Sequence, residues 1–398
     1  MKKTLKNLFF FFLQDIGKRF EKRVKRQIDK EQIRKILIFE NGGIGDLLKV
    51  FPVIEALMAN FPDASISIVV AKPSREILYV FPGKNIFSEI FEFDLKGDHR
   101  GILRKLRFIL SLRKRNYDMI YVPAKGDGMR EISTMAFLSR IPHRIGFKKD
   151  GFGSLNTVTS KFEEDIPILT QNLSLLKGCG LNVWEEEIKV KISEDDLAFA
   201  HRMRLKKDAL PLFVIHPGAS WYGLYKMWGV ENYKMLINQL LKEFKATVIL
   251  IGSKDEEEMG KQIYDGVGNP FLIDMTGKTT IPQLSAIIKE SDLFIGSDSG
   301  PLHIALTVKV PSVAIFGPTS PEQIISPSHR DRCMVVRKKI GCSPCYLHQS
   351  NVVPSCRKIR CLKEISVEDV LKAIRKVATI KCDKEIGKKG EVKKTEIV

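Results

Sequence analysis

The sequence is poor in cysteine and has no long apolar run. It contains 7 cysteines in 398 residues, too few for a disulfide-stabilised scaffold. The apolar stretch near the N-terminus, Leu8 to Leu13, is far shorter than the roughly 20 residues that a membrane-spanning helix needs. No secretory signal is evident, and we therefore expect a cytoplasmic protein.

Acidic residues are also too few to balance the basic ones. The chain has 65 Lys and Arg against 47 Asp and Glu, which gives a net charge of +18 and a pI near 9.5. This imbalance indicates an acidic partner: nucleic acid, an anionic membrane or a phosphorylated substrate. The sequence has neither an RNA-binding signature nor a basic helix with base-reading spacing, so we do not expect a nucleic-acid partner.

The basic residues are densest in an N-terminal arm, residues 1–34. Residues 1–35 contain 12 Lys and Arg against 4 Asp and Glu, a net charge of +8. Apolar residues recur there at helical spacing: Leu5, Leu8, Phe9, Phe12, Ile16, Phe20, Val24 and Ile28. An apolar stripe beside a basic face is typical of a helix lying in a membrane interface. We expect peripheral contact with the cytoplasmic face of the inner membrane; the alternative is packing on the protein itself or on a partner.

The length favours two domains. Short apolar strands alternate with helical segments from residue 35, and the alternation restarts near residue 211 after an interruption over 150–190. This order predicts an α/β protein with Rossmann-like parallel sheets in two domains, 35–185 and 186–365. The linker is expected near 180–190, and ligands are expected in a cleft between the domains, beyond the carboxyl ends of the strands.

Strands and helices are assigned by periodicity and by turn residues. The expected strands are 35–39, 65–70, 87–93, 118–122, 212–216, 246–252, 292–296 and 312–316. The expected helices are 46–59, 75–81, 99–115, 129–140, 169–177, 232–242, 255–263, 281–289, one beginning at Pro301, and an amphipathic C-terminal helix over 366–380. Residues 381–398, rich in lysine and poor in large apolar residues, are expected to be disordered.

The first strand ends in a glycine-rich loop, Asn41-Gly42-Gly43-Ile44-Gly45-Asp46. It lacks the Lys-Ser/Thr pair of a Walker A loop, and both its glycine spacing and the next strand depart from a dinucleotide-binding fingerprint. Asp46 is therefore a carboxylate at the mouth of the expected cleft. It could act as a general base or simply favour the helix dipole.

The segment Asp298-Ser299-Gly300-Pro301-Leu302-His303 joins a strand to a helix. Asp298 and Ser299 are good N-cap residues, Gly300 allows close approach of a ligand, and Pro301 suits the first helical position. The result is a helix N-terminus that favours an anion such as a diphosphate. The alternative is a well-capped structural turn.

Two further loops follow strands of the second domain. His216-Pro217-Gly218-Ala219-Ser220-Trp221 precedes Lys226, which could offset the charge of a leaving diphosphate or could be an ordinary solvated lysine. Gly252 leaves room for a flat base, and a carboxylate after it, Asp255 or Glu256, could hold a ribose diol or could merely favour a helix N-terminus.

Taken together, these blocks resemble glycosyltransferase family 9, the lipopolysaccharide heptosyltransferases. The resemblance covers about 35 to 375 and includes the run 291–305, Pro311 and Phe316-Gly317-Pro318-Thr319. It implies a GT-B fold and an inverting, metal-independent transfer, without a cofactor, of a sugar, most often heptose from ADP-heptose, to an anionic glycolipid. Asp46 and Lys226 correspond to catalytic positions. Donor-binding positions are Ser220, Gly252, Glu256, Asp298, Ser299, Gly300, Pro301, Leu302 and His303.

The acceptor is expected in the first domain. The residues expected to contact it are Gly43, Ile44, Gly45, Lys125 and Arg130, with Arg144, Lys148 and Lys149 as further basic candidates. Each of the five basic residues could instead serve only solubility. One departure from the family lies before Lys226, where Tyr-Gly-Leu-Tyr is longer and more apolar than the usual polar turn. That departure puts the donor contacts of this loop in doubt.

Four cysteines form a second cluster: Cys342, Cys345, Cys356 and Cys361. Their spacing would suit structural zinc, but unmetallated thiols are favoured, and disulfides are not expected in a reducing cytoplasm. The alternatives to sugar transfer are an epimerase or hydrolase of the same fold and a non-catalytic sugar-nucleotide-binding protein. A nicotinamide oxidoreductase is disfavoured because the first domain lacks a ribose-binding acid after its second strand.

Overall fold

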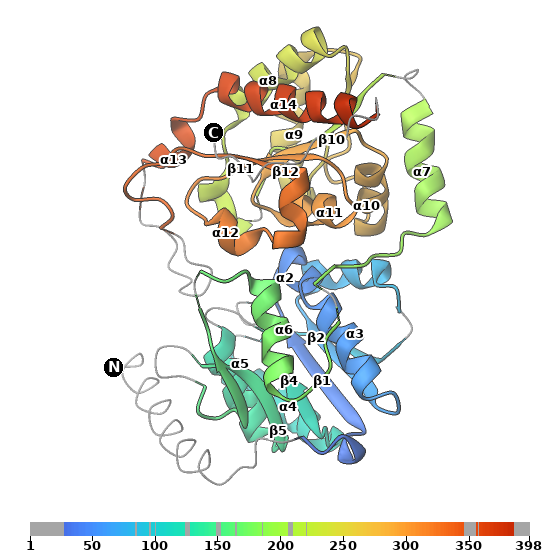
Figure 1. Cartoon of the computed structure of the whole chain (residues 1–398), viewed down its shortest axis with the longest axis vertical. Coiled ribbons are helices and arrows are strands. Elements are labelled where there is room, and N and C mark those ends of the chain that lie inside the picture. Colours follow the sequence, from blue (N-terminus) through green and yellow to red (C-terminus); the bar gives the residue numbers. More distant parts are fainter. Residues whose placement is uncertain are drawn as a thin grey trace. The chain divides into compact units, whose positions relative to one another are not determined.

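The computed structural model describes residues 28–83, 86–94, 97–99, 101–123, 128–148, 153–163, 165–184, 186–205, 210–219, 221–345, 356 and 358–385. The chain divides into two compact units, the first ending at Lys189 and the second beginning at Val190. Each unit contains a parallel six-stranded sheet with helices on its faces (Figure 1). The predicted α/β class with two Rossmann-like sheets is confirmed.

The sheet of the first unit has the order β3-β2-β1-β4-β5-β6, with all strand pairs parallel. Its strands are β1 (Lys35–Glu40), β2 (Ser65–Val70), β3 (Phe87–Glu92), β4 (Met119–Tyr121), β5 (His143–Lys148) and β6 (Val158–Lys161). The last two were not predicted. Their sequences, HRIGFK and VTSK, contain basic and small polar residues instead of a continuous apolar run.

The helices of the first unit agree with the expected ones except at two places. They are α2 (Ile44–Leu48), α3 (Phe51–Asn60), α4 (Ile102–Arg115), α5 (Gly128–Leu138) and α6 (Ile168–Gly178), with 3-10 helices η1 (Lys30–Gln32) and η2 (Lys72–Val80). The single helix predicted over 46–59 is two helices, because α2 ends at Leu48 and α3 restarts with Pro52 in its first turn. The short helix predicted at 75–81 is the 3-10 helix η2.

The second sheet has the equivalent order, β12-β11-β10-β7-β8-β9, and is again parallel. Its strands are β7 (Leu212–His216), β8 (Thr247–Leu250), β9 (Leu272–Asp274), β10 (Leu293–Ser297), β11 (Ser312–Ile315) and β12 (Cys333–Val336). Every residue of β7, β8, β10 and β11 is buried. The two edge strands, β9 and β12, were not predicted.

The helices of the second unit surround this sheet. They are α7 (Glu194–Leu205), α8 (Val230–Glu243), α9 (Glu257–Val267), α10 (Ile281–Lys289), α11 (Gly300–Thr307), α12 (Pro321–Ile324), α13 (Arg360–Lys363) and α14 (Val367–Glu385). Three 3-10 helices join them: η4 (Trp221–Lys226), η5 (Lys254–Glu256) and η6 (Pro327–Arg332). Helix α7 was not predicted. No helix of the described residues is long and apolar enough to cross a bilayer.

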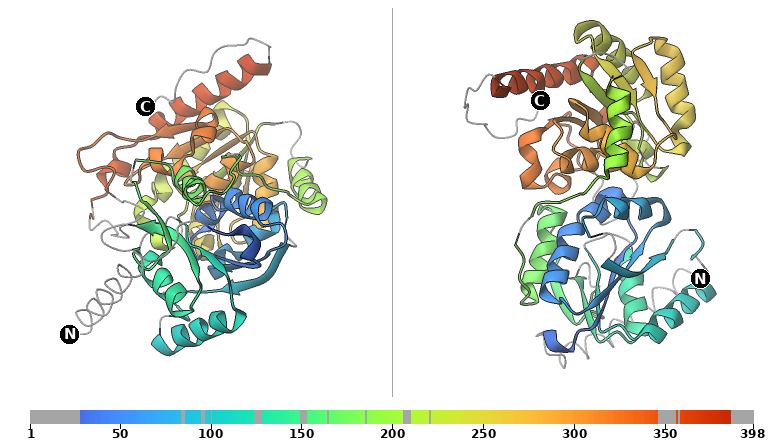
Figure 2. Two further views of the ribbon diagram at one scale, coloured as in Figure 1. Left: turned by 60° about the horizontal axis from the view of Figure 1, so that its bottom comes forward. Right: turned by 90° about the vertical axis from the view of Figure 1, so that its right-hand side faces the viewer.

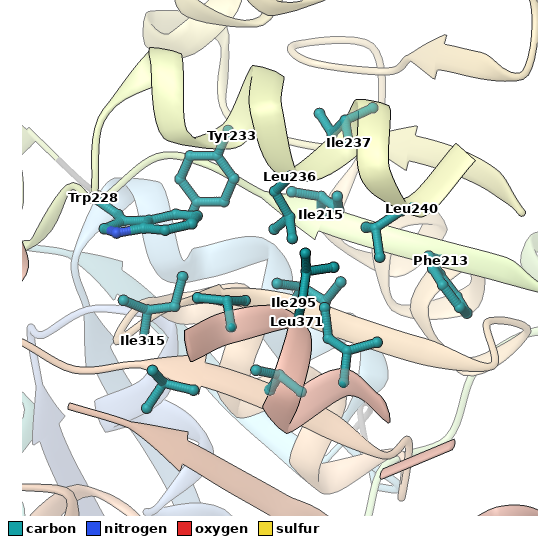
Figure 3. Close-up of a cluster of buried hydrophobic side chains, with 14 of the residues drawn as sticks. Phe213, Ile215, Trp228, Tyr233, Leu236, Ile237, Leu240, Ile295, Ile315 and Leu371 are labelled. Carbon is teal, nitrogen blue, oxygen red and sulfur yellow. The ribbon is translucent and has the colours of Figure 1, made fainter. Parts of the chain in front are cut away.

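The C-terminal helix α14 belongs to the core of the second unit. Helix α14 packs against α8, β11 and β12 (Figures 2 and 3). Leu371 and Ile374 of α14 are buried in the same cluster as Leu236. The helix also continues to Glu385, beyond the predicted end at 380. The rest of the predicted tail and residues 1–27 of the predicted arm lie outside the described residues.

This packing predicts that α14 stabilises the second unit. Ile374 is fully buried, and Ile374→Ala should lower the free energy of unfolding by about 2–5 kcal/mol because it removes apolar contacts and leaves a cavity. Urea denaturation of the full chain measures the change. Lys372→Ala, at an exposed position of the same helix, should change it by no more than about 0.5 kcal/mol. Equal effects of the two substitutions would contradict the packing.

Candidate functional site

The candidate site of the second unit lies where the strand order reverses. From β7 the chain adds β8 and β9 on one side and then β10 on the other, so the carboxyl ends of β7 and β10 are neighbours. His216 is the last residue of β7 and Ser297 the last residue of β10. Ligands of open α/β sheets bind at such a reversal, and the predicted donor-binding loops begin here.

Lys226 and Asp298 form a largely buried ion pair. The ammonium Nζ of Lys226 lies 2.7 Å from Oδ2 of Asp298 and 3.4 Å from its backbone oxygen. The side chains are 13% and 3% exposed, respectively. His303 Nε2 lies 3.9 Å from Oδ1 of the same carboxylate. Lys226 is therefore not a solvated surface lysine, and the pair holds its ammonium beside the start of α11.

Ser299 is the N-cap residue of α11, but its side chain does not cap the helix. Its hydroxyl instead contacts His216 Nδ1 at 2.9 Å. Asp298, the other predicted cap, is turned toward Lys226. The prediction of Ser299 as the N-cap residue is confirmed, although its side chain makes no capping hydrogen bond, and the helix starts at Gly300, with Pro301 second. Because the first-turn N–H groups of a helix have no intrahelical acceptor, those of Gly300 and Leu302 remain suited to an anion.

Glu256 connects this site to the end of β8. Its Oε2 lies 3.3 Å from His216 Nε2 and accepts hydrogen bonds from the backbone N–H (2.7 Å) and hydroxyl (3.0 Å) of Ser253. Burial raises the pKa of this carboxyl, but the hydrogen bonds from His216 and Ser253 outweigh it, and the pKa lies below its ordinary value. Asp255, the alternative from the sequence, is exposed.

Two glycines make room for the Glu256 carboxylate. A Cβ on Gly218 would lie 1.9 Å from Glu256 Oε1, and one on Gly252 would lie 3.0 Å from Oε2 and 2.9 Å from Thr276 Cγ2. Glu256 Oε1 is buried and has no hydrogen-bond partner among the described residues. Sequence reasoning singled out Gly252 but missed Gly218 and the bridging role of His216, because both depend on contacts between separate loops.

In the first unit, Asp46 lies in the first turn of α2. Its Oδ2 accepts the backbone N–H of Gly43 at 3.1 Å, and its side chain is partly exposed. The same loop is held by Glu40, whose buried carboxylate accepts the N–H of Gly42 at 2.6 Å. Ser74 donates to the carbonyl of Gly42 at 2.6 Å. Glu40 was not singled out from the sequence, since it reads there as the polar end of a strand.

Several predicted residues lie outside what the structure describes. Ser220, Lys125 and Lys149 are among them, and for Arg130 only the backbone, within α5, is described. Lys148 is the last residue of β5.

Arg144 is held against the protein by its side chain. Its guanidinium donates to the carbonyls of Ile141, Pro142 and Leu155, and burial lowers its pKa to about 10. These bonds give Arg144 a structural role that the sequence did not predict.

The cysteine cluster does not form a metal site in the described part of the chain. No group of three or more His, Cys, Asp or Glu side chains there is arranged to hold a metal ion. Cys342, Cys345 and Cys356 are exposed, and Cys361 is buried. Burial and the neighbouring thiols raise the pKa of Cys345 and Cys361. The zinc alternative therefore gains no support.

Two Rossmann-like units of this kind define the GT-B class of glycosyltransferase folds. The model of glycosyltransferase family 9 (heptosyltransferase) matches residues 105–354, and the chain belongs to this family. The resemblance found in the sequence is confirmed, and the protein is a glycosyltransferase.

Individual relatives agree with the family. Lipopolysaccharide heptosyltransferase 3 of Escherichia coli K12 is 28% identical over 69% of this chain and 80% of its own length. Lipooligosaccharide heptosyltransferase 2 of Campylobacter jejuni is 26% identical over 85% of this chain and 96% of its own length.

Solved structures share the fold. The ADP-heptose lps heptosyltransferase II of E. coli has a TM-score of 0.65 and 20% identity, covering 87% of this chain and 99% of that one. A family 9 glycosyltransferase of Veillonella parvula has a TM-score of 0.71 and 19% identity, covering 89% and 99%.

The lowered pKa of Glu256 predicts a pH-dependent contribution to stability. A carboxyl whose folded pKa is below its unfolded value stabilises the protein above that value, and the contribution is lost as the pH falls through the folded pKa. Glu256→Gln should therefore lower the free energy of unfolding most near neutral pH. The difference from the wild type should shrink as the pH falls below 4.5, the ordinary pKa of this carboxyl. Urea titrations at several pH values measure it. With Asp255→Asn as the exposed control, a difference for Glu256→Gln that is independent of pH would disprove this assignment.

Proposed function

We propose that this chain transfers a heptose from ADP-heptose to a lipopolysaccharide core or a related cell-surface glycan. One observation carries the proposal: the Lys226–Asp298 pair is held at the first turn of α11, at the strand reversal of the second sheet. This arrangement suits a nucleoside diphosphate, and the lipopolysaccharide heptosyltransferases among the relatives supply the sugar and the acceptor.

The second unit is proposed to bind the donor. The N–H groups of Gly300 and Leu302 would receive the diphosphate oxygens, with Lys226 beside them. Glu256, held by His216 and Ser253, is placed after Gly252 to accept a ribose hydroxyl. Its unpartnered Oε1 supports this role, because a buried carboxylate oxygen without a donor is costly until one arrives.

The first unit is proposed to bind the acceptor around Gly43, Ile44 and Gly45, with Asp46 as general base. Asp46 would take the proton from an acceptor hydroxyl, whose oxygen forms the new bond to the anomeric carbon as the bond to the donor diphosphate breaks. The configuration at the anomeric carbon is thereby inverted. Charge that develops on the leaving diphosphate would be stabilised by Lys226 and the α11 N–H groups, without a metal or cofactor.

The location proposed for the enzyme is the cytoplasmic face of the membrane, where a glycolipid acceptor is anchored. The net charge of +18 supports an anionic acceptor surface. Residues 1–27 of the basic arm are proposed to contribute peripheral contact, whereas Ile28, the last residue of its apolar stripe, is buried in the protein.

The donor is testable by thermal shift. A ligand that binds only the folded state raises the melting temperature. ADP and ADP-heptose, added without metal, should raise it, whereas UDP and GDP sugars should not. A shift only with another sugar nucleotide would retain sugar transfer and discard heptose. No shift with any of them would favour a non-catalytic protein, and consumption of the donor at the same rate without acceptor would favour an epimerase or hydrolase.

Asp46→Asn should bind donor normally but turn over slowly. Asn retains an oxygen that can accept the N–H of Gly43, so the loop should survive, but it cannot accept the proton. Loss of a general base typically costs about 10²–10⁴-fold in rate. A radiolabelled-donor transfer assay measures turnover, and Asp63→Asn, an exposed acid of the same unit, is the matched control. Turnover of Asp46→Asn within a few-fold of wild type would remove this role.

Lys226→Met should lose about 10²–10³-fold in turnover, the scale seen when one stabilising donor of a developing charge is removed. It should also destabilise the fold, because the buried Asp298 carboxylate loses its partner. The double variant Lys226→Met/Asp298→Asn separates the two effects, since it should regain stability and remain inactive. Recovery of turnover in the double variant would show that Lys226 has only a structural role.

A further inference from the structure

Helix α4 of the first unit combines basic and apolar residues in an unusual proportion. It carries six cations and no acid: Arg104, Lys105, Arg107, Arg113, Lys114 and Arg115. It also carries four of the ten large apolar side chains that are exposed among the described residues. In the left view of Figure 2 the helix, drawn in cyan, lies along the outside of the first unit's sheet.

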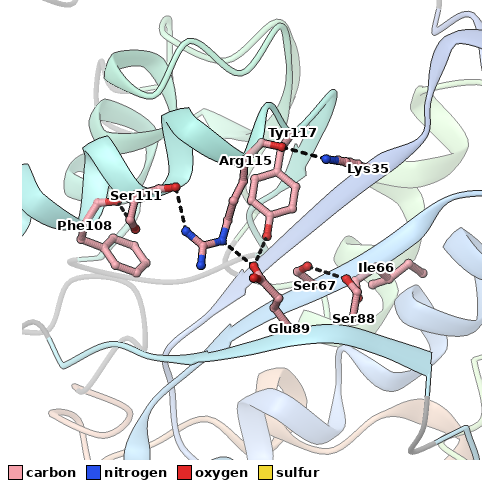
Figure 4. Close-up of polar contacts among 9 residues, drawn as sticks. All are labelled: Lys35, Ile66, Ser67, Ser88, Glu89, Phe108, Ser111, Arg115 and Tyr117. Atoms are coloured by element: carbon pink, nitrogen blue, oxygen red, sulfur yellow. Dashed lines mark hydrogen bonds and ion pairs between the residues drawn. The ribbon is translucent and has the colours of Figure 1, made fainter.

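The inner face of α4 is fixed to the sheet. Phe108, Ile109 and Leu112 are buried in the core of the first unit. At the end of the helix, Arg115 Nε lies 2.5 Å from Glu89 Oε2 on β3, and Tyr117 also donates to this carboxylate (Figure 4). These contacts leave no freedom to turn the helix over, so its opposite face is permanently presented outward.

That outer face is apolar. Ile102, Leu103, Leu106 and Leu110 are 74%, 68%, 45% and 53% exposed. The three leucines are three or four residues apart, which places them together on one side of the helix. Exposure of several large apolar residues on one helix marks an interaction surface rather than ordinary scatter.

The cations of α4 differ in whether they have an ion-pair partner within the protein. Arg104 pairs with Asp98 at 3.3 Å, and Lys105 pairs with Glu131 at 2.6 Å. Arg107, Arg113 and Lys114 form no ion pair with any residue that the structure describes. Arg107 and Lys114 lie three and four residues from Leu110 and so border the leucines.

We propose that the outer face of α4 docks on an anionic phospholipid surface. The leucines would enter the boundary between headgroups and acyl chains, and the flanking cations would contact lipid phosphates. Charge argues against the other occupants: a second copy would bring six further cations, and residues 1–27 carry nine Lys and Arg against two acids. This surface deepens the proposed function because it would hold the acceptor-binding unit at a membrane, yet it is testable without any sugar transfer.

The test uses co-sedimentation of the full chain with vesicles. Wild type should bind vesicles containing phosphatidylglycerol and bind pure phosphatidylcholine weakly, with binding that falls as salt rises. The triple variant Leu103→Gln/Leu106→Gln/Leu110→Gln should bind roughly tenfold more weakly, as should Arg107→Gln/Lys114→Gln. The matched control is Met235→Gln/Tyr264→Gln/Phe271→Gln, which removes three exposed apolar side chains from the second unit and should bind normally.

Hydrogen exchange of wild type locates the contact. Peptides covering 102–115 should gain protection with anionic vesicles. Unchanged exchange there, with binding retained in the triple variant, would assign membrane contact to the arm and overturn the proposal. A wild-type dimer in light scattering that the triple variant dissociates would show that a second copy covers this face, and would also overturn it. The triple variant should transfer sugar normally to a detergent-solubilised acceptor. That result would show that the loss of membrane binding is independent of the proposed catalytic function.

Discussion

The buried carboxylate of Asp298 is the constraint on which the candidate donor site depends. A charge that is 3% exposed needs a partner, and Lys226 supplies it at 2.7 Å. The next residue, Ser299, contacts His216 from the start of α11. His216 in turn contacts Glu256, so three loops of one sheet are linked through neighbouring side chains. The Lys226–Asp298 pair is therefore connected, through these contacts, to the loop after β8.

The first unit builds its loop in a different way. A buried acid, Glu40, and an acid of the helix, Asp46, both accept backbone N–H groups of the glycine-rich segment. In this loop, two carboxylates fix a glycine-rich connection between a strand and a helix. In the second unit, the Lys226–Asp298 ion pair has the same role. Asp46 keeps partial exposure, whereas Glu40 is fully enclosed, and only the exposed acid can meet a substrate.

Much of the fold was predictable because the central strands are continuous apolar runs. β1, β7 and β10 were predicted within one or two residues of their observed ends, since burial on both faces demands such runs. The edge strands β6, β9 and β12 have three or four residues each. A pattern that short cannot be distinguished from a loop in the sequence. The packing partner of α14 could not be predicted, because an apolar stripe does not say which surface covers it.

The candidate site was predictable in its residues but not in its contacts. Asp46, Lys226 and the segment after β10 stand out because charged or capping residues follow strands. The contacts of His216 with Ser299 and Glu256 span 83 and 40 positions, and they arise only from the order β10-β7-β8. The importance of Gly218 could not be predicted for the same reason. Position 218 requires glycine because the Glu256 side chain, which belongs to another loop, lies against it.

The pairing of Lys226 with Asp298 also bears on how a reaction cycle would end. Because the ammonium of Lys226 is paired with a carboxylate, the two side chains present a dipole to an anion and not a full positive charge. A nucleoside diphosphate set free by sugar transfer carries one more negative charge than the sugar nucleotide from which it came. Lys226 and the first turn of α11 would attract this extra charge, and Asp298 would repel it. In the proposed reaction, the carboxylate thereby limits how firmly the site can hold the spent nucleotide.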